Sequence, residues 1–265
     1  MTAPSHALPM LSTELLAHYR HISQLPLTVV DVETTGSLAY RNRTTEIAVV
    51  RASLTNGIQE TLTSLINPRC KIPAKIVEVT GITQEMVQAA PPAEVVLPDF
   101  LPALSEGVLT AHNLEFDYAF LKSEYGRLGY QFSRPPSQQL CTVQLARLML
   151  PDLRSRSLPF LVQHFQFPVP HSHRAEADAI ACWLLAQRLL QEIQNEPDEV
   201  LLARFVRQWL PLKAVARMLG CSQKQAQKRL ETVGVRGHSV GRNHQPIVMY
   251  QRGEVEQVYH ALQQQ

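Results

Sequence analysis

The segment that spans residues 27–36 and reads LTVVDVETTG constrains the fold of this chain more than any other. Its apolar residues predict a buried β-strand, and side chains alternate along a strand, so Asp31 and Glu33 project from the same face. Two neighbouring carboxylates at the end of a buried strand repel each other and lose hydration. Since the segment contains no Lys or Arg, a bound divalent cation is the natural source of compensating charge. The alternative is a strand end at which both acids reach water.

Two further acids strengthen the metal hypothesis. Asp117 lies at the start of a predicted helix that follows a short strand, and Asp178 lies in a long predicted helix. Two hard cations about 3.5–4 Å apart can clamp the attacking and leaving oxygens of a phosphodiester, and they need such a set of carboxylates. His173, five residues before Asp178, is suitably placed to take a proton from the attacking water. The four acids and this histidine are the candidate catalytic residues.

The pattern of apolar residues predicts an α/β domain. Strands over residues 27–33, 46–54 and 60–66 form a predicted meander, because Asn56-Gly57 is a strong hairpin signal. A further short strand is predicted over residues 108–111. Helical periodicity predominates elsewhere, within residues 11–22, from 73 to a break at 81, from 93 to about 105, and within 112–128, 142–150, 158–165 and 174–194.

Composition bounds the class of protein. The chain has 265 residues, of which 45% are hydrophobic and 18% are charged, so it can bury a core. It has no apolar run long enough to span a membrane, and its first ten residues lack the features of a signal peptide. The four cysteines are scattered without a Cys-x-x-Cys pair, which argues against a zinc site and a disulfide framework. We therefore expect a cytoplasmic protein with no membrane partner.

Charge is divided unevenly along the chain. Residues 200–265 carry 10 Lys and Arg against 3 Asp and Glu, a net charge of +7, whereas the preceding residues carry a net charge of −5. Because residues 195–198 read as a linker, we predict an N-terminal helical extension over 1–26, a catalytic domain over 27–195 and a basic domain over 200–265. A basic domain behind an acidic body indicates a polyanionic partner.

The basic domain resembles helix-turn-helix domains. Gly220 permits a tight turn between two predicted helices, and Ser222 can cap the second. The second helix would present three basic residues to nucleic acid, namely Lys224, Lys228 and Arg229. Residues 234–250 are predicted to form a two-stranded wing, and residues 254–262 a closing helix. We expect DNA binding; a small helical domain for protein contacts is the alternative.

Three motifs, in order, resemble those of the DEDDh family of 3′–5′ exonucleases, which includes the epsilon proofreading subunit of DNA polymerase III. Asp-x-Glu-Thr-Thr-Gly begins at Asp31, His-Asn-x-x-Phe-Asp spans residues 112–117, and His-x-x-x-x-Asp spans residues 173–178. The resemblance covers roughly residues 27–193. It implies the ribonuclease H-like fold, in which helices cover both faces of a mixed five-stranded sheet.

The resemblance also implies a role for each motif residue. Asp31 would contact two divalent cations, either Mg²⁺ or Mn²⁺. Glu33 and Asp178 would complete the site of the cation that activates water, and Asp117 would serve the second cation. His173 would be the general base.

The turn that follows the first strand is expected to meet the substrate. The resemblance implies that Thr34, Thr35 and Gly36 lie against the terminal nucleotide. Leu38 is a candidate for an apolar wedge against the last bases. Asn113 is expected near the substrate, where it would support the residues that touch it rather than touch it itself.

Other residues in or near the motifs have simpler interpretations. Glu46 begins a strand and is interpreted as supporting structure, and His112 as a residue that caps or packs at a helix start. His164 and His171 are expected in exposed loops rather than at the metals. Trp183 is expected in the core, because apolar stripes at helical spacing usually face it.

The predicted function is that of a metal-dependent 3′–5′ exonuclease for single-stranded or mispaired 3′ ends of DNA, which releases nucleoside 5′-monophosphates in proofreading or repair. The motifs do not separate DNA from RNA, so an RNA-trimming exoribonuclease is the alternative. A DNA-binding regulator with an inactive nuclease fold is the alternative from another class, disfavoured because the four acids and the histidine are all present. DNA is the expected partner, RNA is a second candidate, and a DNA polymerase or another replisome protein is a third.

Overall fold

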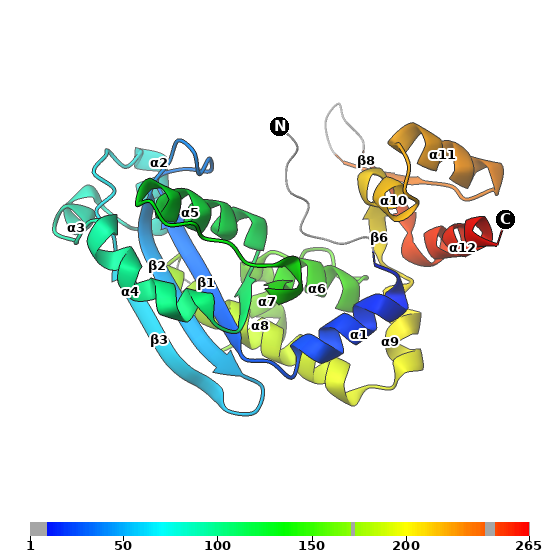
Figure 1. Ribbon diagram of the computed structural model, residues 1–265, viewed down its shortest axis with the longest axis horizontal. Helices are drawn as coiled ribbons and strands as arrows, with labels where there is room; N and C mark the ends of the chain where they lie inside the picture. Colours follow the sequence, from blue (N-terminus) through cyan, green and yellow to red (C-terminus); the bar gives the residue numbers. More distant parts are fainter. Residues whose placement is uncertain (1–9, 171–172, 242–246, 265) are drawn as a thin grey trace. The chain divides into compact units, whose positions relative to one another are not determined.

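The computed structural model describes residues 10–170, 173–241 and 247–264. Packing divides the chain into two compact units, whose helices and most of whose strands are labelled in Figure 1. The larger unit comprises His21–Leu145 and Arg154–Glu192. The smaller unit comprises Met1–Arg20, Ala146–Leu153 and Ile193–Gln265.

A mixed five-stranded sheet lies at the centre of the larger unit. Its strands are β1 (Leu27–Thr34), β2 (Thr44–Ser53), β3 (Gly57–Leu65), β4 (Val108–Ala111) and β5 (Gln139–Cys141). Their order is β3-β2-β1-β4-β5, in which β1 pairs antiparallel with β2 and parallel with β4. The predicted meander and the predicted mixed five-stranded sheet are confirmed. Strand β5 was not predicted, because three residues are too few to show an alternating pattern.

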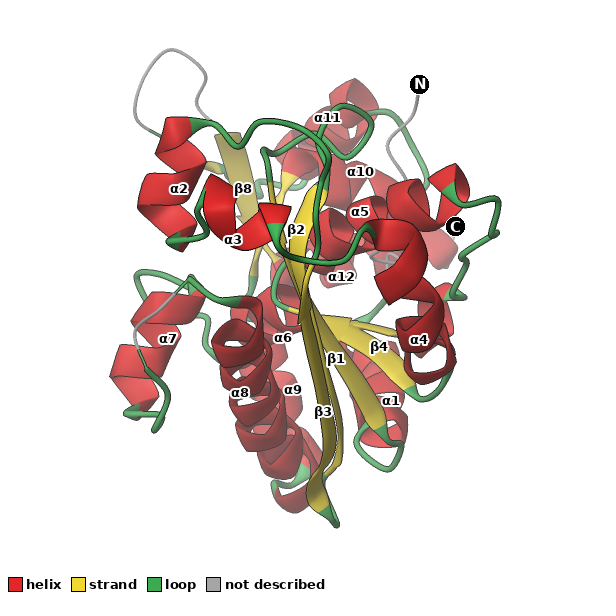
Figure 2. Cartoon of the chain, turned by 90° about the vertical axis from the view of Figure 1, so that its left-hand side faces the viewer, coloured by secondary structure: helices red, strands yellow, loops and turns green. Residues whose placement is uncertain are grey.

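Helices cover both faces of this sheet. Along this part of the chain the helices are α2 (Ala74–Thr80), α3 (Gln84–Gln88), α4 (Ala93–Ser105), α5 (Leu114–Arg127), α6 (Thr142–Met149), α7 (Leu158–Phe165) and α8 (Ala175–Asn195). Val32 of β1 shares a core cluster with Leu97 of α4 and Phe120 of α5. Because side chains alternate along β1, Asp31 and Glu33 project from the opposite face, on which α8 lies (Figure 2).

The regular pairing of β1 with β2 ends at the two acids. Glu33 lies opposite Glu46, and the register then shifts so that Thr34 pairs with Thr44. Such a bulge bends a strand and redirects its side chains, and bulges are common next to active sites. The sheet therefore delivers Asp31 and Glu33 to the point where β1 leaves the ladder.

The smaller unit contains the predicted helix-turn-helix segment. Its elements are α1 (Ser12–Ile22), whose last two residues belong to the larger unit, α9 (Asp198–Phe205), β6 (Trp209–Pro211), α10 (Leu212–Met218), α11 (Gln223–Thr232), β7 (His238–Val240), β8 (Ile247–Gln251) and α12 (Arg252–Gln263). Gly220 has a φ of 60° between α10 and α11, and Ser222 forms a capping box with Gln225. Ala226 and Leu230 are fully buried, as their spacing predicts. The two strands β7 and β8 pair antiparallel within the predicted wing, and β6 pairs with β8.

The N-terminal helix packs with the C-terminal residues. The backbone N–H and the hydroxyl of Ser12 both donate to Glu256 Oε1, at 2.8 Å each. Arg252 donates to the carbonyl of Met10 at 2.8 Å and to Gln208 Oε1 at 2.8 Å. Arg252 and Glu256 are both buried and need polar partners, which these contacts supply. Packing thus groups α1 with residues after 193, a different division from the predicted extension over residues 1–26.

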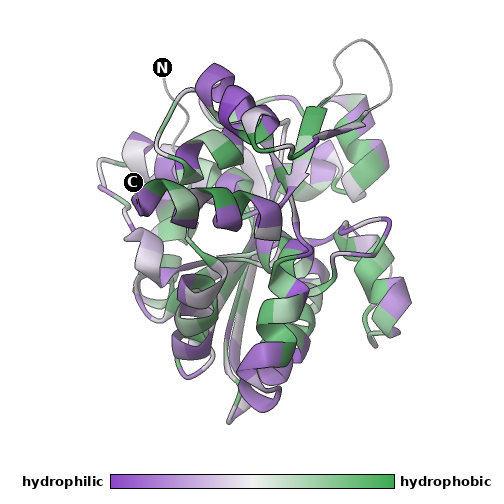
Figure 3. Cartoon of the chain, turned by 90° about the vertical axis from the view of Figure 1, so that its right-hand side faces the viewer, coloured by the Kyte–Doolittle hydropathy of each residue, from purple (hydrophilic) through white to green (hydrophobic). Residues whose placement is uncertain are grey.

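Hydropathy follows this packing within α12, the helix that ends at the marked C-terminus in Figure 3. Val255 and Val258 are buried in the core of the smaller unit, while polar residues such as Gln257 and His260 are exposed. Among the described helices, none combines the length and the apolar character needed to cross a membrane.

Candidate metal centre

Three predicted acids meet where β1 leaves the sheet. Asp31, Glu33 and Asp178 each offer a carboxylate oxygen, and these oxygens all lie within 4.8 Å of one another. β1 supplies the first two from one face, and the first turn of α8 supplies Asp178. Oxygens from several carboxylates at this separation suit a hard divalent cation.

Asp117 adds a fourth acid from another element. It is buried in the first turn of α5, where its Oδ1 accepts a hydrogen bond from the backbone N–H of Val32 at 3.2 Å. Among the neighbouring charges, Asp117 contributes most to raising the pKa of Asp31. The four acids that the sequence singled out therefore interact with one another, although Asp117 lies outside the three-oxygen group.

Burial and mutual repulsion make the four acids resist ionisation. Burial raises the pKa of Asp31 well above its ordinary range, and Asp117, Asp178 and Glu33 raise it further. Burial, followed by Asp178, raises the pKa of Glu33 to about 8. Burial also raises the pKa of Asp117 to about 8 and that of Asp178 to about 6. A divalent cation would supply the positive charge that this cluster lacks, so the donor set fits one.

These pKa values predict how the metal-free protein responds to pH. Since the folded pKa of Glu33 lies near 8 and its ordinary value is 4.5, the folded protein binds more protons than the unfolded chain between those pH values. The free energy of unfolding should therefore fall as pH rises through this window. Glu33→Gln removes one such group, so the fall of the unfolding free energy with pH should become shallower, by up to about 1.4 kcal/mol per pH unit.

Thermal unfolding in EDTA from pH 5 to pH 8 measures this effect for the wild type and for Glu33→Gln. Asp99→Asn, which changes an exposed acid on α4, is the matched control and should keep the wild-type slope. Equal slopes for the wild type and Glu33→Gln would contradict the electrostatic account of the cluster. Added Mg²⁺ or Mn²⁺ should stabilise the wild type most at pH 8, where the acids release their protons.

His173 lies beside the acids at the solvent boundary. It precedes α8, is exposed, and lines a cavity of about 140 Å³ together with Asp178. Its charge lowers the pKa of Asp178, although burial of that acid is the larger effect and acts in the opposite direction. The structure therefore brings His173 to the acid cluster, as the His-x-x-x-x-Asp spacing predicts. His171 lies outside the described residues.

Hydrogen bonds tie the turn after β1 to the following loop. Thr34 donates from Oγ1 to the carbonyl of Gly36 at 2.8 Å. The backbone N–H of Thr35 donates to the carbonyl of Arg43 at 2.9 Å, and the N–H of Arg43 donates back to Thr35 Oγ1 at 3.0 Å. A Cβ at Gly36 would lie 2.7 Å from Asn42 Nδ2, so a glycine suits this position. The turn is held in one conformation next to Glu33.

The remaining predicted substrate residues lie on the loop after the turn and at the start of α5. Leu38 is 44% exposed on the loop after the turn. Asn113 is exposed at the start of α5, where its φ of 77° is left-handed and its side chain makes no capping bond. Neither residue is buried in the core, so both are free to meet a ligand.

Glu46 supports the site, and its partner Arg174 was not foreseen. Arg174 Nε donates to both carboxylate oxygens of buried Glu46, at 3.0 and 3.1 Å, and Nη2 also donates to Oε1. The N–H of Ala175 donates to Glu46 Oε2 at 3.0 Å. This carboxylate therefore anchors the N-terminus of α8, which carries Asp178. No sequence signal links Glu46 to Arg174, because 128 residues separate them.

His112 is hydrogen-bonded on both ring nitrogens just before α5, in agreement with its interpretation as a packing residue. Its Nε2 lies 2.9 Å from the carbonyl of Arg156, and its Nδ1 lies 2.9 Å from Thr142 Oγ1. A carbonyl can only accept, so Nε2 carries a proton. Trp183 is buried in the core, as expected. The loop placement expected for His164 is wrong, because this exposed residue lies in the last turn of α7, whose periodic apolar face continues the helix to Phe165.

Metal-assisted cleavage of a phosphodiester is the chemistry that such a cluster supports. Together with the fold, the cluster defines a class of protein, the metal-dependent nucleases. A family model described as Exonuclease matches residues 28–185. This match covers more than half of the chain, and the chain belongs to that exonuclease family.

Two relatives are similar over about two thirds of the chain. The DNA polymerase III PolC-type of Oceanobacillus iheyensis is 35% identical over 181 residues, which cover 66% of this chain and 12% of that protein. The 3′–5′ exonuclease DinG of Bacillus subtilis is 34% identical over 171 residues, which cover 64% of this chain and 18% of that protein. The chain thus spans a small part of the length of either relative.

Solved structures share the fold. The structure of E. coli exonuclease I in complex with a dT13 oligonucleotide matches with a TM-score of 0.56 and 19% identity, over 62% of this chain and 40% of that chain. The structure of exonuclease X in complex with 5′ overhanging duplex DNA matches with a TM-score of 0.50 and 23% identity, over 68% of this chain and 99% of that chain. Both likenesses concern the fold.

Proposed function

We propose that the chain is a divalent-cation-dependent 3′–5′ exonuclease that hydrolyses the terminal phosphodiester of DNA and releases nucleoside 5′-monophosphates, in proofreading or repair. The observation that carries this proposal is the convergence of Asp31, Glu33 and Asp178 beside Asp117, in a chain of the exonuclease family. The DinG relative, a 3′–5′ exonuclease by name, supports the 3′–5′ direction, and the DNA polymerase III PolC-type relative supports a link to DNA synthesis. The DNA complexes of exonuclease I and exonuclease X support DNA as the substrate.

Each acid has a place in this proposal. Asp31 shares the three-oxygen group with Glu33 and Asp178 and also interacts with Asp117, so we assign it to both cations. Glu33 and Asp178 would complete one cation site, and Asp117 would serve the second. When bound, Mg²⁺ or Mn²⁺ would stabilise negative charge on the phosphate oxygens and acidify the attacking water. Buried Asp117 can hold its position without help from a ligand, because Val32 donates a backbone hydrogen bond to it.

The remaining residues handle the proton and the substrate. His173 at the solvent boundary would take a proton from the attacking water through an imidazole nitrogen. Residues 34–36 would place backbone groups against the terminal nucleotide, since their hydrogen bonds hold the turn beside Glu33. Leu38 and Asn113 would border the substrate from the loop and from the start of α5.

Digestion of matched 3′-labelled DNA and RNA strands tests the proposal. We expect linear single-stranded DNA and mispaired 3′ ends to be shortened stepwise from the 3′ end, faster than a blunt duplex, and EDTA to stop the reaction. A circular single strand should stay intact, because it has no 3′ terminus. Cutting of the circle, or full activity in EDTA, would overturn the proposal. Faster digestion of RNA would favour an exoribonuclease, and binding without digestion of either strand would favour a regulator.

A second proposal concerns the smaller unit, whose α11 would bind nucleic acid. Lys224, Lys228 and Arg229 are exposed on α11, while Ala226 and Leu230 anchor the opposite side of the helix in the core. Arg229 also donates to the carbonyl of Leu219 at 3.3 Å, so it is partly engaged within the unit. The net charge of +7 over residues 200–265 supports a polyanionic partner.

Changing Lys224, Lys228 and Arg229 together to Ala should weaken binding to a long duplex with a 3′ overhang. Each lost phosphate contact should reduce the slope of log affinity against log salt by about 1. Gln223→Ala, a neutral change on the exposed side of α11, is the control and should keep the wild-type slope. Equal slopes for the triple variant and the wild type would favour protein contacts instead. Point variants are preferable to deletion of the unit, because Ser12 of α1 depends on Glu256.

A further inference from the structure

The loop over residues 37–42 follows the turn after β1 and presents an aromatic ring to solvent. Tyr40 is 69% exposed, and the Arg41 guanidinium lies 5.3 Å from the centre of its ring. Leu38 lies on the same loop and is also exposed. An exposed tyrosine contributes little to a core, so packing does not explain its presence here.

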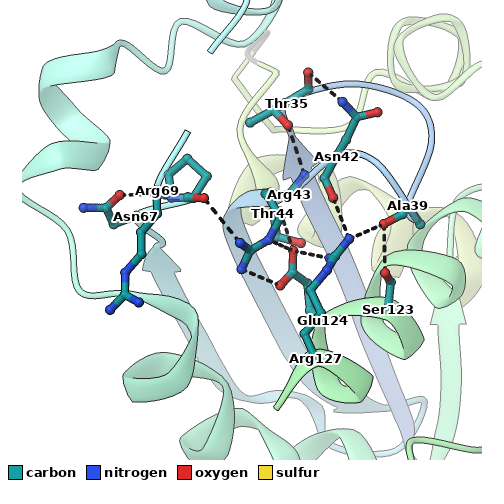
Figure 4. Close-up of polar contacts among 11 residues, drawn as sticks. Thr35, Ala39, Asn42, Arg43, Thr44, Asn67, Arg69, Ser123, Glu124 and Arg127 are labelled. Carbon is teal, nitrogen blue, oxygen red and sulfur yellow. Dashed lines mark hydrogen bonds and ion pairs between the residues drawn. The ribbon is translucent and has the colours of Figure 1, made fainter. Parts of the chain in front are cut away.

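This exposed loop rests on a buried ionic clamp (Figure 4). Glu124 of α5 is only 2% exposed. It accepts hydrogen bonds from Arg43 Nε at 2.9 Å and Arg43 Nη2 at 3.1 Å, and it forms an ion pair with Arg127 Nη1 at 3.0 Å. The backbone N–H of Thr44 also donates to Glu124 Oε1, at 3.1 Å. Two guanidinium groups and an amide thus satisfy one buried carboxylate, which is the condition for such a group to be tolerated.

The clamp holds the loop backbone as well as side chains. Arg127 Nη2 donates to the carbonyls of Ala39 at 2.8 Å and Asn42 at 3.3 Å. Ser123 Oγ donates to the same Ala39 carbonyl at 2.8 Å. Asn42 Oδ1 in turn accepts from the N–H of Leu38 at 3.0 Å. The loop on which Tyr40 stands is therefore attached to α5, the helix that also carries Asp117.

We propose that the loop over residues 37–42 binds the unpaired substrate strand just upstream of the terminal nucleotide, with the Tyr40 ring stacked on a base and Arg41 near a phosphate. In this proposal, Glu124 is a positioning residue that acts through Arg43 and Arg127. The inference rests on the exonuclease function proposed above. Aromatic rings combined with cationic groups are the surface that unpaired nucleic acid binds without sequence preference.

Two features of the structure favour a nucleic-acid strand as the occupant of this surface. The loop begins directly after the turn at residues 34–36, and hydrogen bonds between Thr35 and Arg43 join its far end to that turn. A strand whose last phosphodiester lies at Asp31 and Glu33 would therefore continue toward the loop. Preorganisation by Glu124 lowers the entropy that the loop loses on binding, so its rigidity contributes to affinity.

The test compares two substrates of the same protein. One is a single-stranded oligodeoxynucleotide, and the other is the p-nitrophenyl ester of thymidine 5′-monophosphate, which has no upstream nucleotide. Tyr40→Ala should raise KM for the strand about 5- to 100-fold, the range that corresponds to loss of one base–aromatic stack, and should raise KM for the ester far less. Tyr40→Phe keeps the aromatic ring, so its KM for the strand should stay near the wild-type value. Tyr130→Ala, which removes an exposed tyrosine beyond α5, is the control and should keep the wild-type KM for both.

The role of Glu124 is tested with a double variant. Glu124→Gln should raise KM for the strand, and Tyr40→Ala should add little in the Glu124→Gln background, because the loop is then already displaced. If the two effects on KM multiply, Glu124 acts independently of Tyr40, and its role as the positioning residue of this loop is overturned. Should Glu124→Gln fail to fold, Arg127→Ala carries the same comparison, since it removes only contacts to the loop and to Glu124.

The outcomes separate this inference from the function on which it rests. If the wild type hydrolyses neither substrate, the proposed exonuclease function fails. If it hydrolyses both and Tyr40→Ala keeps the wild-type KM for the strand, the inference about the loop is overturned, and a protein partner becomes the better explanation of Tyr40.

Discussion

Replacement of Asp31 by Asn is expected to lower kcat at least about 10³-fold while making the metal-free protein more stable at pH 8. The loss is expected because Asp31 belongs to the three-oxygen group with Glu33 and Asp178 and interacts electrostatically with Asp117, so both proposed cation sites depend on it. The gain in stability follows because burial and four neighbouring acids raise the pKa of Asp31, and Asn carries no charge to repel them. Opposite signs for activity and stability distinguish a metal ligand from a residue that supports the fold.

Three measurements check this prediction. They are hydrolysis of a 3′-labelled strand, thermal unfolding in EDTA, and calorimetric titration with Mn²⁺. Asp99→Asn, at an exposed position on α4, is the control and should leave all three unchanged. Retained turnover in Asp31→Asn at saturating Mn²⁺ would refute the assignment of the acid cluster. A lower melting temperature in EDTA would show instead that Asp31 contributes to folding.

Replacement of His173 by Ala is expected to lower kcat about 10²–10⁴-fold, the usual contribution of a positioned general base. KM should change little, because the acids and the turn over residues 34–36 remain in place. His173 is exposed and lines a small cavity with Asp178, so the variant should fold normally and leave space for a small base. Added imidazole should therefore restore part of the lost rate.

His164 offers a matched control for this variant. It is another exposed histidine of the same unit, in the last turn of α7, and His164→Ala should keep wild-type turnover. Wild-type turnover in His173→Ala would refute the general-base role. A reduced rate that imidazole fails to restore at any concentration would indicate that His173 positions substrate rather than accepting a proton.

The order of elements could be predicted because the signals are local. Alternating and periodic apolar residues located β1, β4 and α7 to within one residue, since each pattern depends only on neighbours along the chain. The capping of α11 by Ser222 and the turn at Gly220 could also be predicted from the sequence, because both depend on the conformation of a few consecutive residues. Strands β5 and β6 were not predicted, since three residues are too few to show an alternation of apolar and polar side chains.

The acid set was also evident in the sequence, because carboxylates are unusual at the positions that these residues occupy. Asp31 and Glu33 interrupt an apolar strand, and His173 and Asp178 flank a helix start at a characteristic spacing. Such residues need a physical reason to occur there, and a shared divalent cation supplies one. The structure then showed that Asp178 shares a three-oxygen group with the strand acids, while Asp117 stands beside them.

Only the tertiary structure decided which residues hold this site and its loop in place. Glu46 and Arg174 are 128 residues apart, Arg43 and Glu124 are 81 apart, and Ser12 and Glu256 are 244 apart. Each buried carboxylate needs a cationic or hydrogen-bonding partner, but the sequence does not say which one, because the partner depends on which elements the fold brings together. The sequence by itself determined the chemistry of the cluster and the elements that carry it. The packing of the sheet and helices decided that Glu46 anchors α8, that Glu124 holds the loop under Tyr40, and that α1 joins the C-terminal unit.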